Sequence, residues 1–199
     1  MGIEASDQEL SPFWPGFGVM KSLVKTAARL ALGEYSLYRI YQAGPPTTTA
    51  EHPVVRRLTE AEIAISMDPL IAQQAWYGGE GSECFALLDD DAIAVVCFYW
   101  FGDRYKSRGF WPLAPSEAKL VQIVTAPAFR GRGLATTLIR TSACLMSNLG
   151  YRNLFARVWH SNDPSWKAFE RAGWRRIASV AELNPLRLAQ PWRLRWRCG

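Results

Sequence analysis

The stretch Phe129-Arg130-Gly131-Arg132-Gly133-Leu134-Ala135 decides the fold, because it joins two segments of different periodicity. An apolar run from Leu120 to Val124 precedes it. Apolar residues then recur after it at helical spacing (Leu134, Leu138, Ile139, Leu145). We therefore expect a strand that leads through a glycine-bearing turn into a helix.

A turn of this kind predicts an anion site. The first N–H groups of a helix have no intrahelical acceptor and lie at the positive end of the helix dipole, and glycine lets an anion come close to the chain. A phosphate or a diphosphate is the expected ligand. The stretch lacks the Lys-Ser/Thr that follows the last glycine of a P-loop, and it lacks the G-x-G-x-x-G spacing of a dinucleotide fold.

Two motifs resemble those of the GNAT acetyltransferase superfamily. Arg130-x-x-Gly133-x-Ala135 resembles the acyl-CoA diphosphate signature and follows Pro127 and Phe129. After the apolar run 154–159 comes Asn162-x-x-Ser165-x-x-x-Phe169-x-x-x-Gly173-Trp174, which resembles the family's pattern of Asn, small residue, Tyr and Gly-Phe. The resemblance covers the chain from about Val54 to its C-terminus.

The resemblance implies a mixed α/β fold of α+β character, with a mostly antiparallel central sheet that is flanked by helices and splayed at the acyl-CoA site. It implies an acetyltransferase domain over residues 54–199. Residues 1–53 form an N-terminal extension in this reading, with an amphipathic helix at Val19–Leu32, a strand at Tyr35–Gln42 and a linker at Ala43–Pro53. The basic face of this helix could contact an anionic membrane surface, but we favour a docked helix whose basic side chains face solvent.

Local signals predict the elements of the domain. Thr59 with Glu62 forms a capping box for a helix that runs toward Met67, where Pro69 interferes. The acidic turn Asp89–Asp91 links a hairpin, and consecutive carboxylates at such a tip favour solvent over a metal ion. The expected strands are 54–58, 83–88, 92–101, 118–125, 153–159, 175–181 and 191–198, and the expected helices are 133–149 and 164–172.

The loop from Gly102 to Ser116 is long, aromatic and basic. Loops of that length often carry function, so this one is the first place to look for contacts with an acceptor. A covering flap is an equally good reading.

The resemblance also implies where coenzyme A lies. Backbone groups of Ile123, Val124 and Thr125 would bind the pantetheine arm. The diphosphate would lie on the N–H groups of the turn and the helix start, at Arg130, Gly131, Arg132, Gly133, Leu134 and Ala135, with Thr136 close by. Either arginine could touch the phosphates or lie in solvent. Asn162 would bridge the arm and the loop, or cap the following helix, or do both.

Acyl transfer to an amine needs a neutral nucleophile, an oxyanion donor and a path for the proton. By family analogy the N–H of Val124 is the oxyanion donor, and Ser165 lies near the thioester sulfur or simply starts a helix. Glu117 precedes the central strand and could act as a base through water, or it could be a surface glutamate. Gln122 could orient a water molecule.

Phe169 departs from the family pattern. Many members have a tyrosine at this position that protonates the departing thiolate, and phenylalanine has no hydroxyl to donate. Another group or water would then serve, or the thiolate would leave unprotonated, or the protein would bind acyl-CoA with little turnover.

Composition favours one core and a cytoplasmic protein. The chain has 199 residues, of which 49% are hydrophobic, and no apolar run long enough to span a bilayer. Its four cysteines show no C-x-x-C pairing and its two histidines stand far apart, so neither disulfides nor a metal site is expected.

Charge is divided unevenly. Residues 1–116 carry 9 basic and 14 acidic side chains, and residues 117–199 carry 14 and 4. The basic half surrounds the expected phosphate turn and suits coenzyme A. Nucleic acid is a weaker reading, because no nucleic-acid-binding motif is present.

These observations predict an acetyl-CoA-dependent N-acyltransferase that acts on a primary amine of a small molecule or a protein. Two alternatives stay open. One is an acyl-CoA-binding module with little turnover, and the other is a peripheral membrane or partner-binding protein.

Overall fold

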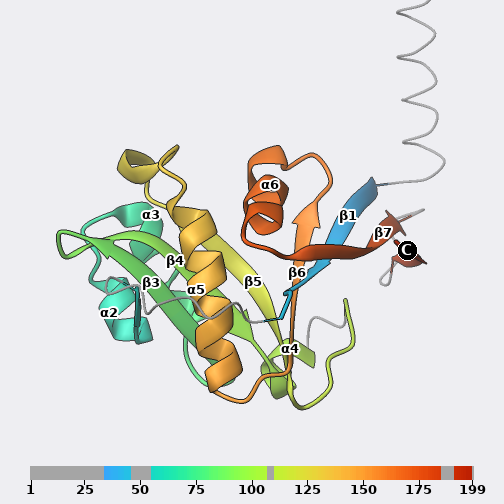
Figure 1. Cartoon of the computed structure of the whole chain (residues 1–199), viewed down its shortest axis with the longest axis horizontal. Helices are drawn as coiled ribbons and strands as arrows, with labels where there is room; N and C mark the ends of the chain where they lie inside the picture. The colour runs from blue at the N-terminus through green and yellow to red at the C-terminus, as the bar shows by residue number, and fades with distance from the viewer. Residues whose placement is uncertain (1–33, 46–54, 107–109, 185–190, 199) are drawn as a thin grey trace, which may run out of the picture. The chain divides into compact units, whose positions relative to one another are not determined.

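The computed structural model describes residues 34–45, 55–106, 110–184 and 191–198 (Figure 1). Contacts divide the chain into two units. One comprises Leu37–Ala181 with Leu194–Gly199, and the other comprises Met1–Ser36 with Glu182–Arg193. In the second unit, Arg193 Nε forms an ion pair of 2.9 Å with Glu182 Oε2. The candidate site lies within the first unit, which the following paragraphs describe.

The described helices and strands follow the order that the sequence predicts, with four short additions. The additions are α3, α4 and the two 3-10 turns, η1 and η2. The elements are β1 (Glu34–Gln42), β2 (Val55–Arg57), α2 (Glu60–Ala64), α3 (Pro69–Ala72), η1 (Ala75–Tyr77), β3 (Ser82–Asp89), β4 (Ala92–Trp100), α4 (Gly102–Lys106), β5 (Glu117–Thr125), η2 (Pro127–Phe129), α5 (Leu134–Asn148), β6 (Asn153–Trp159), α6 (Asp163–Arg171), β7 (Arg175–Asn184) and β8 (Trp192–Arg197).

The strands form one sheet in the order β2-β3-β4-β5-β6-β1-β7-β8. The pairs β2–β3, β3–β4, β4–β5 and β1–β6 are antiparallel, and β5–β6 is parallel. Asp90 and Asp91 have φ values of 47° and 67°, as a tight hairpin turn between β3 and β4 requires. The expected mixed, mostly antiparallel sheet is therefore confirmed.

Helices cover both faces of the sheet. On one face α5 packs on β3, β4, β5 and β6 through a core that includes Leu138, Ile139 and Leu120 (Figure 1). On the opposite face Ile63 of α2 and Ile71 of α3 pack against a second cluster. Burial of these apolar side chains supplies the main driving force for this arrangement.

The helices before β3 differ from the expected single helix. The capping box is confirmed, since Thr59 Oγ1 accepts from the Glu62 N–H and the Glu62 carboxylate accepts from the Thr59 N–H. However, α2 ends at Ala64 and does not reach Met67. Pro69 then begins α3, because Asp68 caps that helix by accepting from the N–H of Leu70.

A bulge in β5 changes which side chains face which layer. Phe98 pairs with Gln122 and Tyr99 pairs with Leu120, so Val121 has no counterpart in β4. Leu120 belongs to the core under α5, and so does Ile123 beyond the bulge, although the two are three positions apart and would face opposite sides of a regular strand. An extra residue reverses the alternation of a strand in this way, and bulges often re-aim side chains beside functional sites.

Strand β1 joins the sheet of the domain. Its residues pair with β6 from Tyr38↔Trp159 to Gln42↔Phe155. The sequence analysis places this strand in the N-terminal extension. In the structure it pairs with β6, so the sheet includes a strand that precedes the linker. The expected helix at residues 19–32 and most of the linker lie outside the described residues. Among the described helices, none has the length and apolar character needed to cross a bilayer.

Candidate active site

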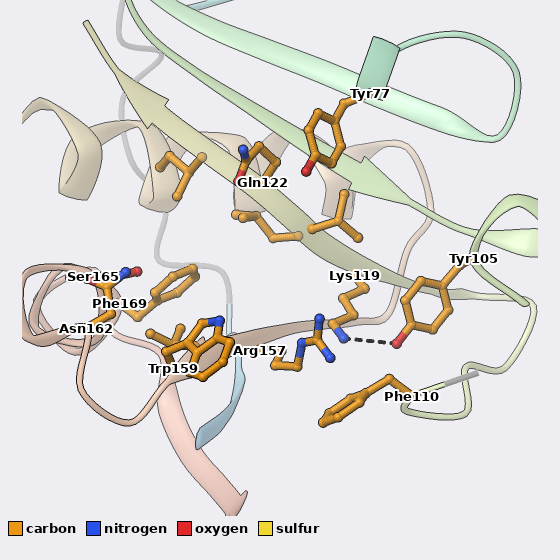
Figure 2. A pocket seen from close by; sticks show the side chains of 14 residues that line it. Tyr77, Tyr105, Phe110, Lys119, Gln122, Arg157, Trp159, Asn162, Ser165 and Phe169 are labelled. Atoms are coloured by element: carbon orange, nitrogen blue, oxygen red, sulfur yellow. Dashed lines mark hydrogen bonds between the residues drawn. The ribbon is translucent and has the colours of Figure 1, made fainter. Parts of the chain in front are cut away.

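Strands β5 and β6 part at the middle of the sheet. Their parallel ladder runs from Glu117↔Asn153 to Leu120↔Ala156, and both strands continue beyond it. A pocket of about 370 Å³ lies where they part (Figure 2). Its lining comes from β5, β6, α6, η1 and the segment after β4 (Tyr77, Tyr105, Phe110, Lys119, Leu120, Val121, Gln122, Ile123, Arg157, Val158, Trp159, Asn162, Ser165 and Phe169).

The pocket meets both faces of the sheet. Ile123 and Phe169 belong to the core under α5, whereas Val121 packs with the cluster under α2 and α3. Gln122 is bonded to Gln74, which follows α3. The lining of the pocket therefore comes from both faces of the sheet.

The turn before α5 has the geometry of an anion site. Gly131 and Gly133 adopt φ values of 78° and 76°, a region that strongly favours glycine. Helix α5 begins at Leu134 with no side chain bonded to its first N–H groups. Within the described part of the chain, no acceptor is bonded to the N–H groups of residues 131–135. A Cβ added at either glycine would meet no atom within 4 Å, so the space over the turn is open.

Both arginines of the turn contact protein groups. Arg132 forms an ion pair of 2.9 Å with Asp89 at the β3–β4 hairpin, and its guanidinium lies 5.6 Å from the centroid of the Phe129 ring. Arg130 Nε donates to the carbonyl of Thr125 at 3.3 Å. The backbone thus remains the main candidate for phosphate contact, with Arg132 held beside it.

Asn162 caps α6 and lines the pocket. Its Oδ1 accepts from the N–H of Ser165 at 3.2 Å, which caps α6, and its side chain also lines the pocket. Figure 2 shows Asn162, Ser165 and Phe169 together on one side of the pocket. The structure therefore brings the second sequence motif against the parted strands.

Phe169 occupies the position where many family members have a tyrosine. Its ring is buried, stacks on Tyr41 at 5.8 Å between centroids and meets the edge of Trp174 at 5.1 Å. The Tyr41 hydroxyl donates to Glu170 Oε1 at 2.9 Å, and burial raises the pKa of Tyr41. The hydroxyl-bearing side chains that line the pocket are those of Tyr77, Tyr105 and Ser165.

The register of β5 determines which N–H groups face the parted edge. The Ala126 N–H donates to the Ala94 carbonyl in β4 at 2.9 Å. Residues that are two apart in an antiparallel ladder point the same way, so the N–H of Val124 also points toward β4. Ile123 and Thr125 then present their groups toward β6. This differs from the sequence-based choice of Val124 as an oxyanion donor.

Glu117 lies apart from the pocket. Its carboxylate accepts from the Ala114 N–H at 2.9 Å and from Asn153 Nδ2 at 2.8 Å, and it is absent from the lining. Both bonds join chain segments at the start of β5. The structure therefore does not bring Glu117 together with the other predicted site residues.

Several lining residues lie outside the two sequence motifs. Tyr77 reaches the pocket from η1, and its ring packs on Phe98 at 5.5 Å. Lys119 is 4% exposed and donates to Tyr105 Oη at 3.0 Å. Arg157 and Phe110 complete this end of the pocket, with the guanidinium 4.3 Å from the ring centroid. Tyr105 and Phe110 come from the loop that the sequence nominates for acceptor contacts.

The described residues hold no group of three or more His, Cys, Asp or Glu side chains that could bind a metal ion. Cys84 and Cys97 are buried free thiols, and burial raises the pKa of Cys97 to about 12. The arrangement thus combines an open helix N-terminus that suits an anion with a gap between two parallel strands of the same sheet.

Comparison with known proteins agrees with this arrangement. Residues 52–174 match the model of the Acetyltransferase (GNAT) family, and the chain belongs to that family. Members of the family take the acyl group from acetyl-CoA. Family membership confirms the sequence resemblance and the fold that it implies.

Individual relatives are similar over part of their length. A Bacillus subtilis (strain 168) protein, YwnH, provisionally named a phosphinothricin acetyltransferase, is 34% identical over 113 residues, which are 55% of this chain and 66% of that protein. A GNAT-family acetyltransferase structure from Novosphingobium aromaticivorans DSM 12444 has a TM-score of 0.55 at 20% identity, over 76% of this chain and 64% of that one. One from Colwellia psychrerythraea has a TM-score of 0.51 at 14% identity, over 89% and 62%. The chain therefore spans just under two thirds of these relatives.

Proposed function

We propose that the protein is an acetyl-CoA-dependent N-acetyltransferase that acts on a primary amine. The observation that carries the proposal is that β5 leads, beyond the point where it parts from β6, directly into the turn and the uncapped N-terminus of α5. Coenzyme A has a diphosphate at one end of a long neutral arm and a thiol at the other. A backbone anion site that leads into a gap with unpaired strand groups fits such a molecule.

We assign the contacts of the cofactor as follows. The diphosphate lies on the N–H groups of Gly131 to Ala135, with Thr136 beside it. The pantetheine arm lies along β5 and bonds the groups of Ile123 and Thr125 that face β6. Asn162 reaches the same arm from the start of α6, and Phe169 packs beside the thioester with Ser165 near the sulfur.

The bulge supplies the oxyanion donor in this proposal. Val121 has no counterpart in β4 and lines the pocket, so we assign this role to its N–H. An N–H at that point can donate to the thioester oxygen as negative charge develops on it. The amine nitrogen attacks the carbonyl carbon, the C–N bond forms, the C–S bond breaks, and the thiolate leaves.

The proton of the amine leaves by water in this mechanism, since the described lining contains no carboxylate or imidazole. Gln122 is the positioning residue, because its Nε2 is bonded to Gln74 and its Oε1 is the available acceptor for an amine or a water molecule. Glu117 has a structural role at the start of β5. Water, Ser165 or a pocket tyrosine returns a proton to the thiolate.

Turnover tests the proposal. The full chain is incubated with acetyl-CoA and a panel of amines, loss of thioester absorbance is followed, and the acetylated product is identified by mass. Calorimetry with coenzyme A measures binding separately. Stimulation of thioester loss by at least one amine supports the proposal, and tight binding of coenzyme A without transfer to any amine contradicts it.

Phe169 supports a second candidate, an acyl-CoA-binding protein with little turnover. A buried phenyl ring at the position of the family's acid removes one route for thiolate protonation. The same experiment separates the two candidates.

A further inference from the structure

We propose that the acceptor carries an anionic group, a carboxylate or a comparable oxyanion, close to the amine that is acetylated. This inference rests on the proposed function, and it names the substrate class of the same pocket. It is carried by two cations, Lys119 and Arg157, at the end of the pocket away from the α6 motif (Figure 2).

The strand register places both cations on one face of the sheet. Lys119 pairs with Phe155, and Arg157 is two residues further along β6, so all three side chains leave the same face. That face is opposite to the one covered by α5, because the neighbouring residues Ala118 and Leu120 belong to the α5 core. The cations thus lie on the side from which we expect the acceptor.

Aromatic rings hold the two charges near each other. Lys119 Nζ lies 4.9 Å and Arg157 Cζ 4.3 Å from the centroid of the same ring, that of Phe110. Arg157 also lies 4.6 Å from the Tyr38 ring. Cation–π contacts fix the direction of a side chain but do not neutralise its charge.

The lining makes this end of the pocket positive. Of the fourteen lining side chains, two are cationic and none is anionic. Among the described residues, the ion pairs do not include Arg157. A guanidinium that rests on aromatic faces can still offer its N–H edge to a planar carboxylate, which it binds better than any neutral group.

The same charges bear on the chemistry of the amine. Nearby cations disfavour a cationic ammonium, so a simple diamine or an aminoglycoside would be repelled. An amino acid carries its own anion, which offsets that repulsion and anchors the molecule. The observations therefore favour a small amino acid over a polycation.

Matched acceptors test the inference. Glycine, alanine and glutamate are compared with their α-amides. The amino groups of the amides lose a proton more readily than those of the acids. A preference for the acids therefore cannot come from a larger share of neutral amine. We expect kcat/KM to be at least about tenfold higher for the best acid than for its amide. Equal values, or a preference for the amides, would overturn the inference while leaving acetyl transfer itself established. Absence of transfer to every amine would overturn both proposals.

Two variants and one control locate the effect. Arg157→Gln and Lys119→Gln should each raise KM for the acid by about tenfold, with little change for the amide or for acetyl-CoA. Arg152→Gln removes one exposed charge just before β6 and should change none of these values. Equal losses for acid and amide would indicate a structural role and contradict the inference.

Product inhibition of the unaltered protein tests the inference even if a variant of a buried residue fails to fold. N-acetyl amino acids should compete with the acceptor, whereas N-acetyl amino acid amides should not. Equal inhibition by both classes would contradict the inference.

Discussion

The side-chain amide of Gln122 donates a hydrogen bond from Nε2 to Oε1 of Gln74 at 2.9 Å. Gln74 is itself buried and donates from Nε2 to the carbonyl of Leu70 at 3.0 Å. This chain of bonds runs from α3 to the pocket and fixes the plane of the Gln122 amide. A helix that touches no ligand thus orients a polar group at the site.

Gln74→Leu should lower kcat by about three- to tenfold with little change in KM for acetyl-CoA. The substitution leaves the Gln122 amide without its partner, and loss of orientation at a reacting centre costs rate more than binding. Gln73→Leu is the matched control, since Gln73 is the exposed neighbour. Steady-state kinetics measure both variants, and equal kcat values would contradict the positioning role.

Gly133→Ala should weaken binding of coenzyme A by at least about tenfold. A side chain at φ 76° costs about 1–2 kcal/mol of stability, and its Cβ would point into the open space over the turn. Gly150→Ala is the control, because Gly150 follows the other end of α5 with φ 95° and equally open space. Calorimetry with coenzyme A should show a change for the first variant only, although both lose stability.

Asp89→Asn should tighten coenzyme A binding by about two- to threefold at low salt. The carboxylate of Asp89 pairs with Arg132 beside the phosphate turn, and its removal leaves the arginine's charge to the diphosphate. The pair is largely exposed, so the gain should vanish near 0.5 M salt, where the screening length is only a few ångströms. Weaker binding at low salt would show that the pair orders the turn instead.

Phe169→Tyr should raise kcat by about three- to tenfold if thiolate departure limits turnover. The ring lines the pocket, and a phenol supplies the proton donor that this position lacks. Pre-steady-state measurement of thiol release against product formation reports the step directly. An unchanged rate of thiol release in a folded variant would mean that water or another hydroxyl already serves.

Stability should fall as the pH rises above about 9. The Cys97 thiol loses its proton near its ordinary pKa of 9.0 in the unfolded chain, whereas burial raises its pKa to about 12 in the folded protein. The unfolded state then binds fewer protons between these values, so each pH unit removes about 1.4 kcal/mol for this thiol. Its contribution is fully present below pH 9.

Urea unfolding between pH 8 and 10.5 under reducing conditions measures this loss. The unfolding free energy of Cys97→Ala should decline less steeply with pH than that of the parent protein. Some decline should remain, because burial also raises the pKa of Cys84 and of Tyr99. Identical slopes would contradict the assignment.

Local signals explain why most elements were predictable. The span 153–159 for β6 and the capping box at Thr59 follow from patterns within a few residues, and both are confirmed. The glycine-bearing turn before α5 was predictable for the same reason, because its two glycines adopt backbone angles that only glycine tolerates well.

Features that depend on distant pairing were not predictable. The bulge at Val121 has no Gly or Pro to mark it, and it decides which N–H groups of β5 face the gap. Lys119 and Arg157 meet only because β5 and β6 are adjacent. Tyr77 enters the pocket because η1 packs on β4, a contact between residues far apart in the chain.

The most direct test of the central claim is a titration of the ¹⁵N-labelled protein with coenzyme A, followed by backbone amide chemical shifts. The account predicts large shifts at residues 131–135, together with Val121, Ile123 and Thr125, that all saturate with one dissociation constant. Shifts that leave the turn before α5 unchanged, or that centre on another part of the chain, would contradict it.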